Sequence, residues 1–169
     1  VFTFLAFIIV KYKYVQLPVK TMFIAEQAAT FTIFYFSILL LNFIASKNDL
    51  TLKNNFEILL YSLFLLLIPE SLMSSRVIWA NFFILLALRR LISLRSKKNV
   101  KTKLFDAAIL ISVASLFYFW SLLFFGLIPI VLLFYSSGNI KHWLIPFLGL
   151  ATVLVLSISV SIILYNNYW

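Results

Sequence analysis

Two glutamates are the residues best placed to act as catalytic acids or bases. Glu26 lies about one turn inside a long apolar stretch that starts near Thr21. A carboxylate in such a stretch is costly and often functional. Glu70 follows Pro69 at the end of a shorter apolar stretch. In the alternative interpretation, Glu26 is an interfacial acid stabilised by the helix dipole and by water. Beyond these two candidates, the sequence leaves the catalytic residues unknown.

Four arginines are the candidates for binding a phosphate or an anionic lipid headgroup. A planar guanidinium can donate two parallel hydrogen bonds to one phosphate. The four stand near the ends of apolar stretches and are Arg76, Arg89, Arg90 and Arg95. In the alternative interpretation, Arg76 pairs with Glu70 across a surface turn, and Arg89 and Arg90 only anchor a helix at the membrane edge.

Other kinds of site are excluded by composition. The chain has no cysteine and a single histidine, His142. These counts exclude disulfides, thiolate metal sites and multi-histidine metal sites. The three glycines are too far apart to form a phosphate-binding loop. The sequence therefore predicts no metal and identifies no cofactor. Two amides inside apolar stretches, Asn42 and Asn81, are expected to form hydrogen bonds between helices.

The elements that position these residues must be membrane helices. The chain is 64% hydrophobic and 11% charged, and its mean hydropathy is +1.08. No soluble core could bury so much apolar surface, so lipid must be its main solvent. The fold class predicted is an all-α, polytopic transmembrane helical bundle. The net charge of +9 is explained by basic loops on the cytoplasmic side, so nucleic acid is not an expected partner.

One transmembrane domain, 1–169, is expected, with about six helical segments besides a truncated first one. Their expected ranges are 1–10 (truncated), 21–45, 56–73, 77–94, 104–117, 121–135 and 143–165. The apolar runs at both ends of the chain indicate a fragment of a longer protein. The stretch 104–135 is either one kinked helix or, as we prefer, a helical hairpin with a turn near Tyr118–Ser121.

The connection Arg89–Lys103 fixes the predicted orientation. These fifteen residues hold seven of the fourteen basic side chains of the chain. Short loops rich in Arg and Lys stay on the cytoplasmic side. We therefore expect loop 89–103 in the cytoplasm, where it can also contact anionic lipid.

Four strings carry a resemblance to a known family. They are LTLKNNFEILLYSLFLLLIPESL (Leu50–Leu72), ANFFILLALRRLISLRSKKN (Ala80–Asn99), KLFDAAILISVASLFYFWSLLF (Lys103–Phe124) and WLIPFLGL (Trp143–Leu150). Together they resemble a Bacteroidota-specific family of uncharacterised multi-pass inner-membrane proteins. The resemblance implies a multi-pass protein of the bacterial inner (cytoplasmic) membrane, with further residues at both ends.

A more distant resemblance is to the GT-C class of polyprenyl-phosphate-sugar glycosyltransferases. It rests on the order of Phe83–Arg90, Arg95–Lys103, Leu104–Tyr135 and Lys141. It implies a GT-C-like fold and a polyprenyl-phosphate-linked sugar as donor. The link Lys11–Lys20 lacks the acid that these enzymes carry in their first external loop, and Glu26 is the nearest acid.

Three functions remain open from the sequence. The first is a non-catalytic component of cell-envelope biogenesis that binds anionic lipid or protein partners through its basic loop. The sequence does not identify the protein partners. The second is a GT-C-like transferase with Glu26 or Glu70 as acid or base and Arg76 near the phosphate of a polyprenyl phosphate. The third is a transporter, disfavoured because few polar residues line the helices. All three share the lipid bilayer as a partner.

Overall fold

A computed structural model describes residues 21–48, 56–68, 74–135 and 141–165. The chain divides into two compact units, Val1–Leu85 and Leu86–Trp169, which are described separately below. The truncated helix expected at 1–10 and the link that follows it lie outside the described residues.

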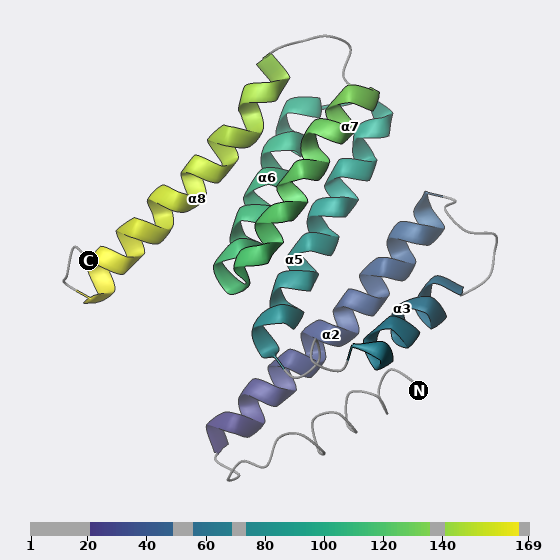
Figure 1. The fold of residues 1–169 in the computed structure, drawn as a ribbon, viewed down its shortest axis with the longest axis vertical. Coiled ribbons are helices and arrows are strands. Elements are labelled where there is room, and N and C mark those ends of the chain that lie inside the picture. The colour runs from purple at the N-terminus through teal and green to yellow at the C-terminus, as the bar shows by residue number, and fades with distance from the viewer. Residues whose placement is uncertain (1–20, 49–55, 69–73, 136–140, 166–169) are drawn as a thin grey trace. The chain divides into compact units, whose positions relative to one another are not determined.

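The described residues form helices only, which confirms the all-α fold class (Figure 1). The α-helices are α2 (Thr21–Lys47), α3 (Phe56–Leu67), α5 (Ser75–Ile92), α6 (Val100–Phe117), α7 (Leu127–Tyr135) and α8 (Lys141–Tyr165), and the 3-10 helices are η1 (Ser93–Ser96) and η2 (Phe119–Gly126). Three stretches have the length and apolar composition of membrane spans: Glu26–Lys47, Ser75–Ser96 and His142–Leu164.

Helix α2 buries two hydroxylic side chains and exposes several large aromatic ones. Thr30 and Ser37 are fully buried, whereas Tyr35 and Phe36 are each 53% exposed. The buried hydroxyls cost little because each donates to a carbonyl of its own helix, Thr30 Oγ1 to Glu26 at 2.7 Å and Ser37 Oγ to Ile33 at 2.9 Å. Small interior residues and an apolar outer surface are typical of helices packed in lipid.

The first unit has a small core that joins three helices. Phe34 of α2 and Ile78 of α5 are buried together, with Tyr61 of α3 packed against them. Asn81 Nδ2 donates a hydrogen bond of 2.7 Å to Tyr61 Oη. This contact confirms the interhelical bond predicted for Asn81. Asn42 differs, because its Oδ1 accepts from Ser46 Oγ of the same helix at 3.4 Å.

Helix α3 is described over twelve residues, Phe56–Leu67. At 1.5 Å per residue it is about 18 Å long, well short of a hydrocarbon core of about 30 Å. The continuation expected to Met73 falls on 69–73, outside the described residues.

In the second unit, the stretch 104–135 is a helical hairpin. Helix α6 begins at Val100, four residues before the expected start, and ends at Phe117. Tyr118 is extended (φ −145°, ψ 107°), which breaks the helix, and η2 then returns along α6. Helix α7 begins directly after Gly126. Pro129 lies in its first turn, where proline is best tolerated in a helix.

Helices α6 and α8 approach each other closely at Gly149. A Cβ added at Gly149 would lie 2.7 Å from Ala108 Cβ and 3.2 Å from the Phe105 carbonyl oxygen. Ala108 itself is fully buried. Small residues at such a crossing allow two backbones to come together. Gly149 therefore sets the spacing of the two helices.

Beyond this crossing, the second half of α8 is exposed. Val153 is 6% exposed and is its last buried apolar residue. Exposed apolar side chains follow on every face of the helix and are Leu154, Val155, Leu156, Ile158, Val160, Ile162, Ile163 and Leu164. A described helix that is apolar all round and uncovered has the character of a lipid-facing span.

Candidate functional site

The basic stretch that includes the end of α5, η1 and the start of α6 forms a compact turn, residues 89–103, called the basic turn below. Helix η1 is followed by Lys97, whose N–H donates to the Leu94 carbonyl at 2.9 Å and whose φ is 53°. Asn99 is also left-handed, with φ 51°, and its carbonyl accepts from the Lys103 N–H at 3.2 Å. Two left-handed residues so close together reverse the chain within a few positions. Asn tolerates this conformation well, whereas Lys adopts it at some cost.

The Lys103 side chain forms hydrogen bonds across the basic turn. Its Nζ donates to the Ser93 carbonyl at 2.7 Å and to Ser96 Oγ at 2.8 Å. Carbonyls at the end of a helix lack internal partners, and an ammonium group is a favourable donor to them. Below them, Leu94 is 2% exposed and packs into the core of the unit. One of the seven basic side chains thus serves the structure of the turn.

Arg90 is engaged in an ion pair. Its Nη2 lies 3.3 Å from Asp106 Oδ2, and the two side chains are 51% and 31% exposed. A pair this exposed contributes less than about 1 kcal/mol. It nevertheless ties the end of α5 to the first turns of α6. Of the predicted phosphate-binding arginines, Arg90 is therefore already partnered by a carboxylate.

The remaining basic side chains of the turn form an exposed cationic surface. They are Arg89, Arg95, Lys97, Lys98 and Lys101. Seven basic residues and Asp106 leave this region with a net charge of six positive. An anionic membrane surface attracts each such side chain by about 1 kcal/mol. The geometry suits several phosphates at a surface better than one enclosed phosphate.

The other predicted site residues lie elsewhere in the chain. Arg76 is exposed at the start of α5, in the first unit, whereas Arg89, Arg90 and Arg95 belong to the second. Glu26 is exposed in α2. Glu70 lies outside the described residues, so its predicted pairing with Arg76 stays a prediction. The structure thus brings together three of the four arginines.

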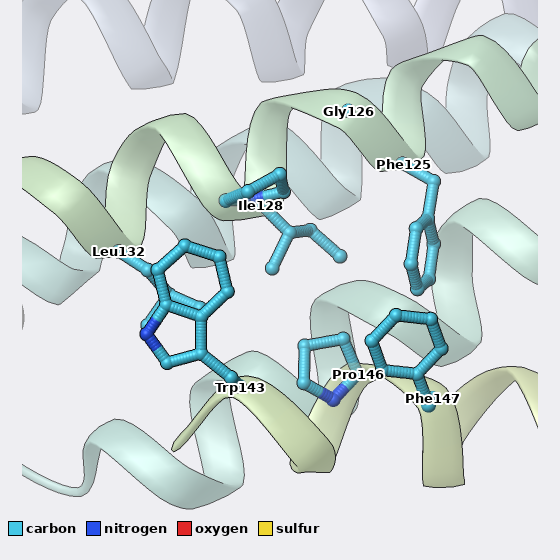
Figure 2. A pocket seen from close by; sticks show the side chains of 8 residues that line it. Phe125, Gly126, Ile128, Leu132, Trp143, Pro146 and Phe147 are labelled. Carbon is cyan, nitrogen blue, oxygen red and sulfur yellow. The ribbon is translucent and has the colours of Figure 1, made fainter. Parts of the chain in front are cut away.

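An apolar cavity lies between the returning arm of the hairpin and α8 (Figure 2). Its volume is about 230 Å³, and its lining is almost wholly apolar. Ile128, Leu132 and Pro146 are buried and form its floor. Trp143 and Phe147 are exposed and stand at its mouth. Figure 2 shows these side chains facing one another from the two helical segments.

A glycine and a pair of aromatic rings border the cavity. Gly126 lines it without a side chain, and a Cβ added there would meet nothing within 4 Å. At the same end, the rings of Phe125 and Phe147 meet edge to face, with centroids 5.8 Å apart. The sequence shows the glycine and the aromatic residues, but nothing in their spacing predicts that they face each other.

The cavity and the basic turn both adjoin the buried core of the second unit. Leu94 of η1 and Leu104 of α6 belong to the same buried cluster as Ile128 and Leu132. Helix η1 also contacts α7 directly. Because α7 runs back toward the start of α6, the end of α7, the start of α8 and the basic turn lie at the same end of the unit (Figure 1).

Among the described residues, no group of three or more His, Asp or Glu side chains could hold a metal ion. Comparisons with protein-family models, with curated proteins and with solved structures gave no match to this chain.

Proposed function

We propose that the chain is a multi-span protein of the bacterial inner membrane, and that its basic turn faces the cytoplasm and binds anionic lipid headgroups. Its role is that of a non-catalytic component of cell-envelope biogenesis. The observation that carries the proposal is the contrast within the second unit. Five cationic side chains are exposed at one end of helices whose outer surfaces are otherwise apolar.

Physical chemistry supports this orientation. The turn joins the end of the candidate span Ser75–Ser96 to α6, so its charges stand where a span leaves the hydrocarbon. Basic residues beside a span are retained in the cytoplasm. The cytoplasmic leaflet also carries the anionic lipids that attract them. The family resemblance, which implies an inner-membrane protein, points the same way.

Cysteine labelling tests the orientation cleanly, because the chain has no cysteine of its own. Ser96→Cys places a thiol in the basic turn, and Arg76→Cys places one at the opposite end of the same candidate span. A membrane-impermeant maleimide added to intact spheroplasts should label position 76 and spare position 96. After the membrane is opened, both should react. Labelling of position 96 from outside would refute the orientation.

Lipid selectivity tests the binding itself. The purified protein is titrated with anionic phosphatidylglycerol and zwitterionic phosphatidylcholine at low salt. Arg89→Gln with Arg95→Gln should lower the affinity for the anionic lipid by up to about fivefold per charge, since each cation contributes about 1 kcal/mol. Arg76→Gln, which removes a charge elsewhere, serves as the control. Equal affinity of wild type and the double variant would contradict the proposal.

The transferase and transporter alternatives gain no specific observation within the described ranges. The transferase hypothesis makes one sharp demand on the residues above. If Glu26 is a catalytic acid or base, Glu26→Gln should fail to restore growth or envelope integrity to a strain that lacks the gene. Full complementation would remove Glu26 as a candidate.

A further inference from the structure

The apolar cavity beside Pro146 has the size and lining for a single hydrocarbon chain. Its volume of about 230 Å³ exceeds the roughly 150 Å³ that accommodates a benzene ring. It falls below the roughly 300–1,000 Å³ of sites for drug-sized polar ligands. Its apolar walls offer water none of the two to four polar partners that an ordered water needs. The cavity therefore suits an alkyl group and excludes a sugar.

The cavity lies at the end of a candidate span, close to the membrane surface. That span begins at His142, and the α8 residues that line the cavity run from Trp143 to Phe147. These positions cover about 6 Å along the helix axis. Trp143, at the mouth, is a residue type that settles at the level of the headgroups. In a bilayer, the cavity would thus lie just below the headgroups, where acyl chains begin.

Charge at the same end of the unit selects the kind of lipid. Leu132 lines the cavity and belongs to the same buried cluster as Leu94 of the basic turn, and η1 contacts α7. An amphiphile with its chain in the cavity would therefore hold its headgroup on the side of the exposed cations. A negatively charged headgroup complements them, whereas a zwitterionic one gains little.

We propose that the cavity holds the part of one acyl chain nearest the ester linkage of an anionic bilayer phospholipid. The phosphate of this lipid lies toward the basic turn. This inference rests on the lipid-binding turn proposed above and adds a defined chain site to it. A lipid held at both ends would be retained specifically, in contrast to lipids that merely surround the helices.

Quenching of Trp143 fluorescence by brominated lipid tests the chain site directly, since bromine quenches an indole only on contact. Changing Trp79, Trp120 and Trp169 to Phe leaves Trp143 as the single tryptophan of the full chain. Vesicles contain either brominated phosphatidylglycerol in plain phosphatidylcholine or the reverse, at equal fractions. We expect local enrichment of the anionic lipid at Trp143 of about fivefold, the preference that one cation near an anionic surface supplies. Bromines near the ester end should quench more than bromines near the chain terminus.

Two matched controls separate the cavity from general lipid contact. A protein with Trp120 as its single tryptophan reports an indole that is 63% exposed in η2, and it should be quenched equally by both lipids. Ile128→Phe adds bulk at a buried residue that lines the cavity and should abolish the preference at Trp143. Leu133→Phe adds bulk at a position of α7 that is 72% exposed and outside the cavity, and it should leave the preference unchanged.

Each other outcome overturns the inference. Equal quenching of Trp143 by both lipids would mean ordinary surrounding lipid only. Absence of quenching by either would mean that a second copy or another part of the chain fills the cavity. If either result occurs while the Arg89 and Arg95 variants still lose anionic-lipid affinity, the chain site fails and the proposed function stands. If those variants bind like wild type, the proposed function fails as well.

Discussion

Replacing Gly149 with Ala should destabilise the second unit by forcing α6 and α8 apart. The added Cβ would lie 2.7 Å from Ala108 Cβ, whereas carbon atoms pack at about 3.5–4.0 Å. Helix α8 must therefore shift by about 1 Å. Overpacking of this kind costs about 1–3 kcal/mol. Alanine regains up to about 1 kcal/mol of helix propensity over glycine, so the net loss should be about 0–2 kcal/mol.

A second glycine in the same unit isolates the steric part of this cost. Gly126→Ala gains similar backbone rigidity, but its Cβ meets nothing within 4 Å. The free energy of unfolding of both variants is measured in mixed micelles by titration with a denaturing detergent. Gly149→Ala should be less stable than Gly126→Ala by about 1–3 kcal/mol, which is the overpacking cost alone.

A double variant identifies the atoms that clash. Ala108→Gly removes the Cβ nearest to position 149, so the cost of Gly149→Ala should shrink in that background. The rescue should be partial, because the Phe105 carbonyl oxygen at 3.2 Å remains. A coupling energy of at least about 0.5 kcal/mol is expected for residues in contact. Equal stability of Gly149→Ala and Gly126→Ala, together with no coupling between positions 149 and 108, would refute the close approach of α6 and α8.

Three further contacts lead to predictions with smaller expected effects. Because the Arg90–Asp106 pair is exposed, a double-mutant cycle with Arg90→Gln and Asp106→Asn should give a coupling below about 1 kcal/mol that fades with salt. Lys103→Met removes both hydrogen bonds inside the basic turn, so trypsin added to inside-out vesicles should cleave the turn faster, and an unchanged rate would contradict this role. Tyr61→Phe leaves Asn81 without its partner hydroxyl across α3 and α5, and the free energy of unfolding should fall by about 0.6 kcal/mol, the mean for such bonds in membranes. No loss in Tyr61→Phe, together with a loss in Tyr61→Ala, would show that ring packing, and not the hydrogen bond, holds the contact.

The sequence was most informative where hydropathy alone decides the structure. Long apolar runs between charged segments predict helices of spanning length, and the stretch 104–135 is too long for one upright helix, which indicates the hairpin. The start of α6 was harder to place, because its first turn contains Lys101 and Lys103. Lysine is a good helix former, so the helix extends into a segment that hydropathy assigns to the loop.

The candidate site depended on partners that lie far apart in the chain. The seven basic residues of the turn are visible in the sequence, but the roles of Arg90 and Lys103 depend on contacts with Asp106 and Ser93. Nothing in the spacing of Gly149 names Ala108 as its neighbour. The cavity likewise arises from two segments whose apolar residues look alike in sequence. Hydropathy predicts that such residues lie in lipid or in a core, but it does not say which of them face each other.

The uneven packing of α8 has a consequence for how the chain tolerates change. Up to Val153 one face of the helix packs against its neighbours, whereas from Leu154 to Leu164 its described apolar side chains are exposed on every face. A saturation scan should therefore divide the helix into two zones. In the first, size and shape are constrained at individual positions; in the second, most apolar exchanges are silent and only charged or helix-breaking residues are rejected. Over evolutionary time the first zone should keep its residues while the second drifts among Leu, Ile, Val and Phe.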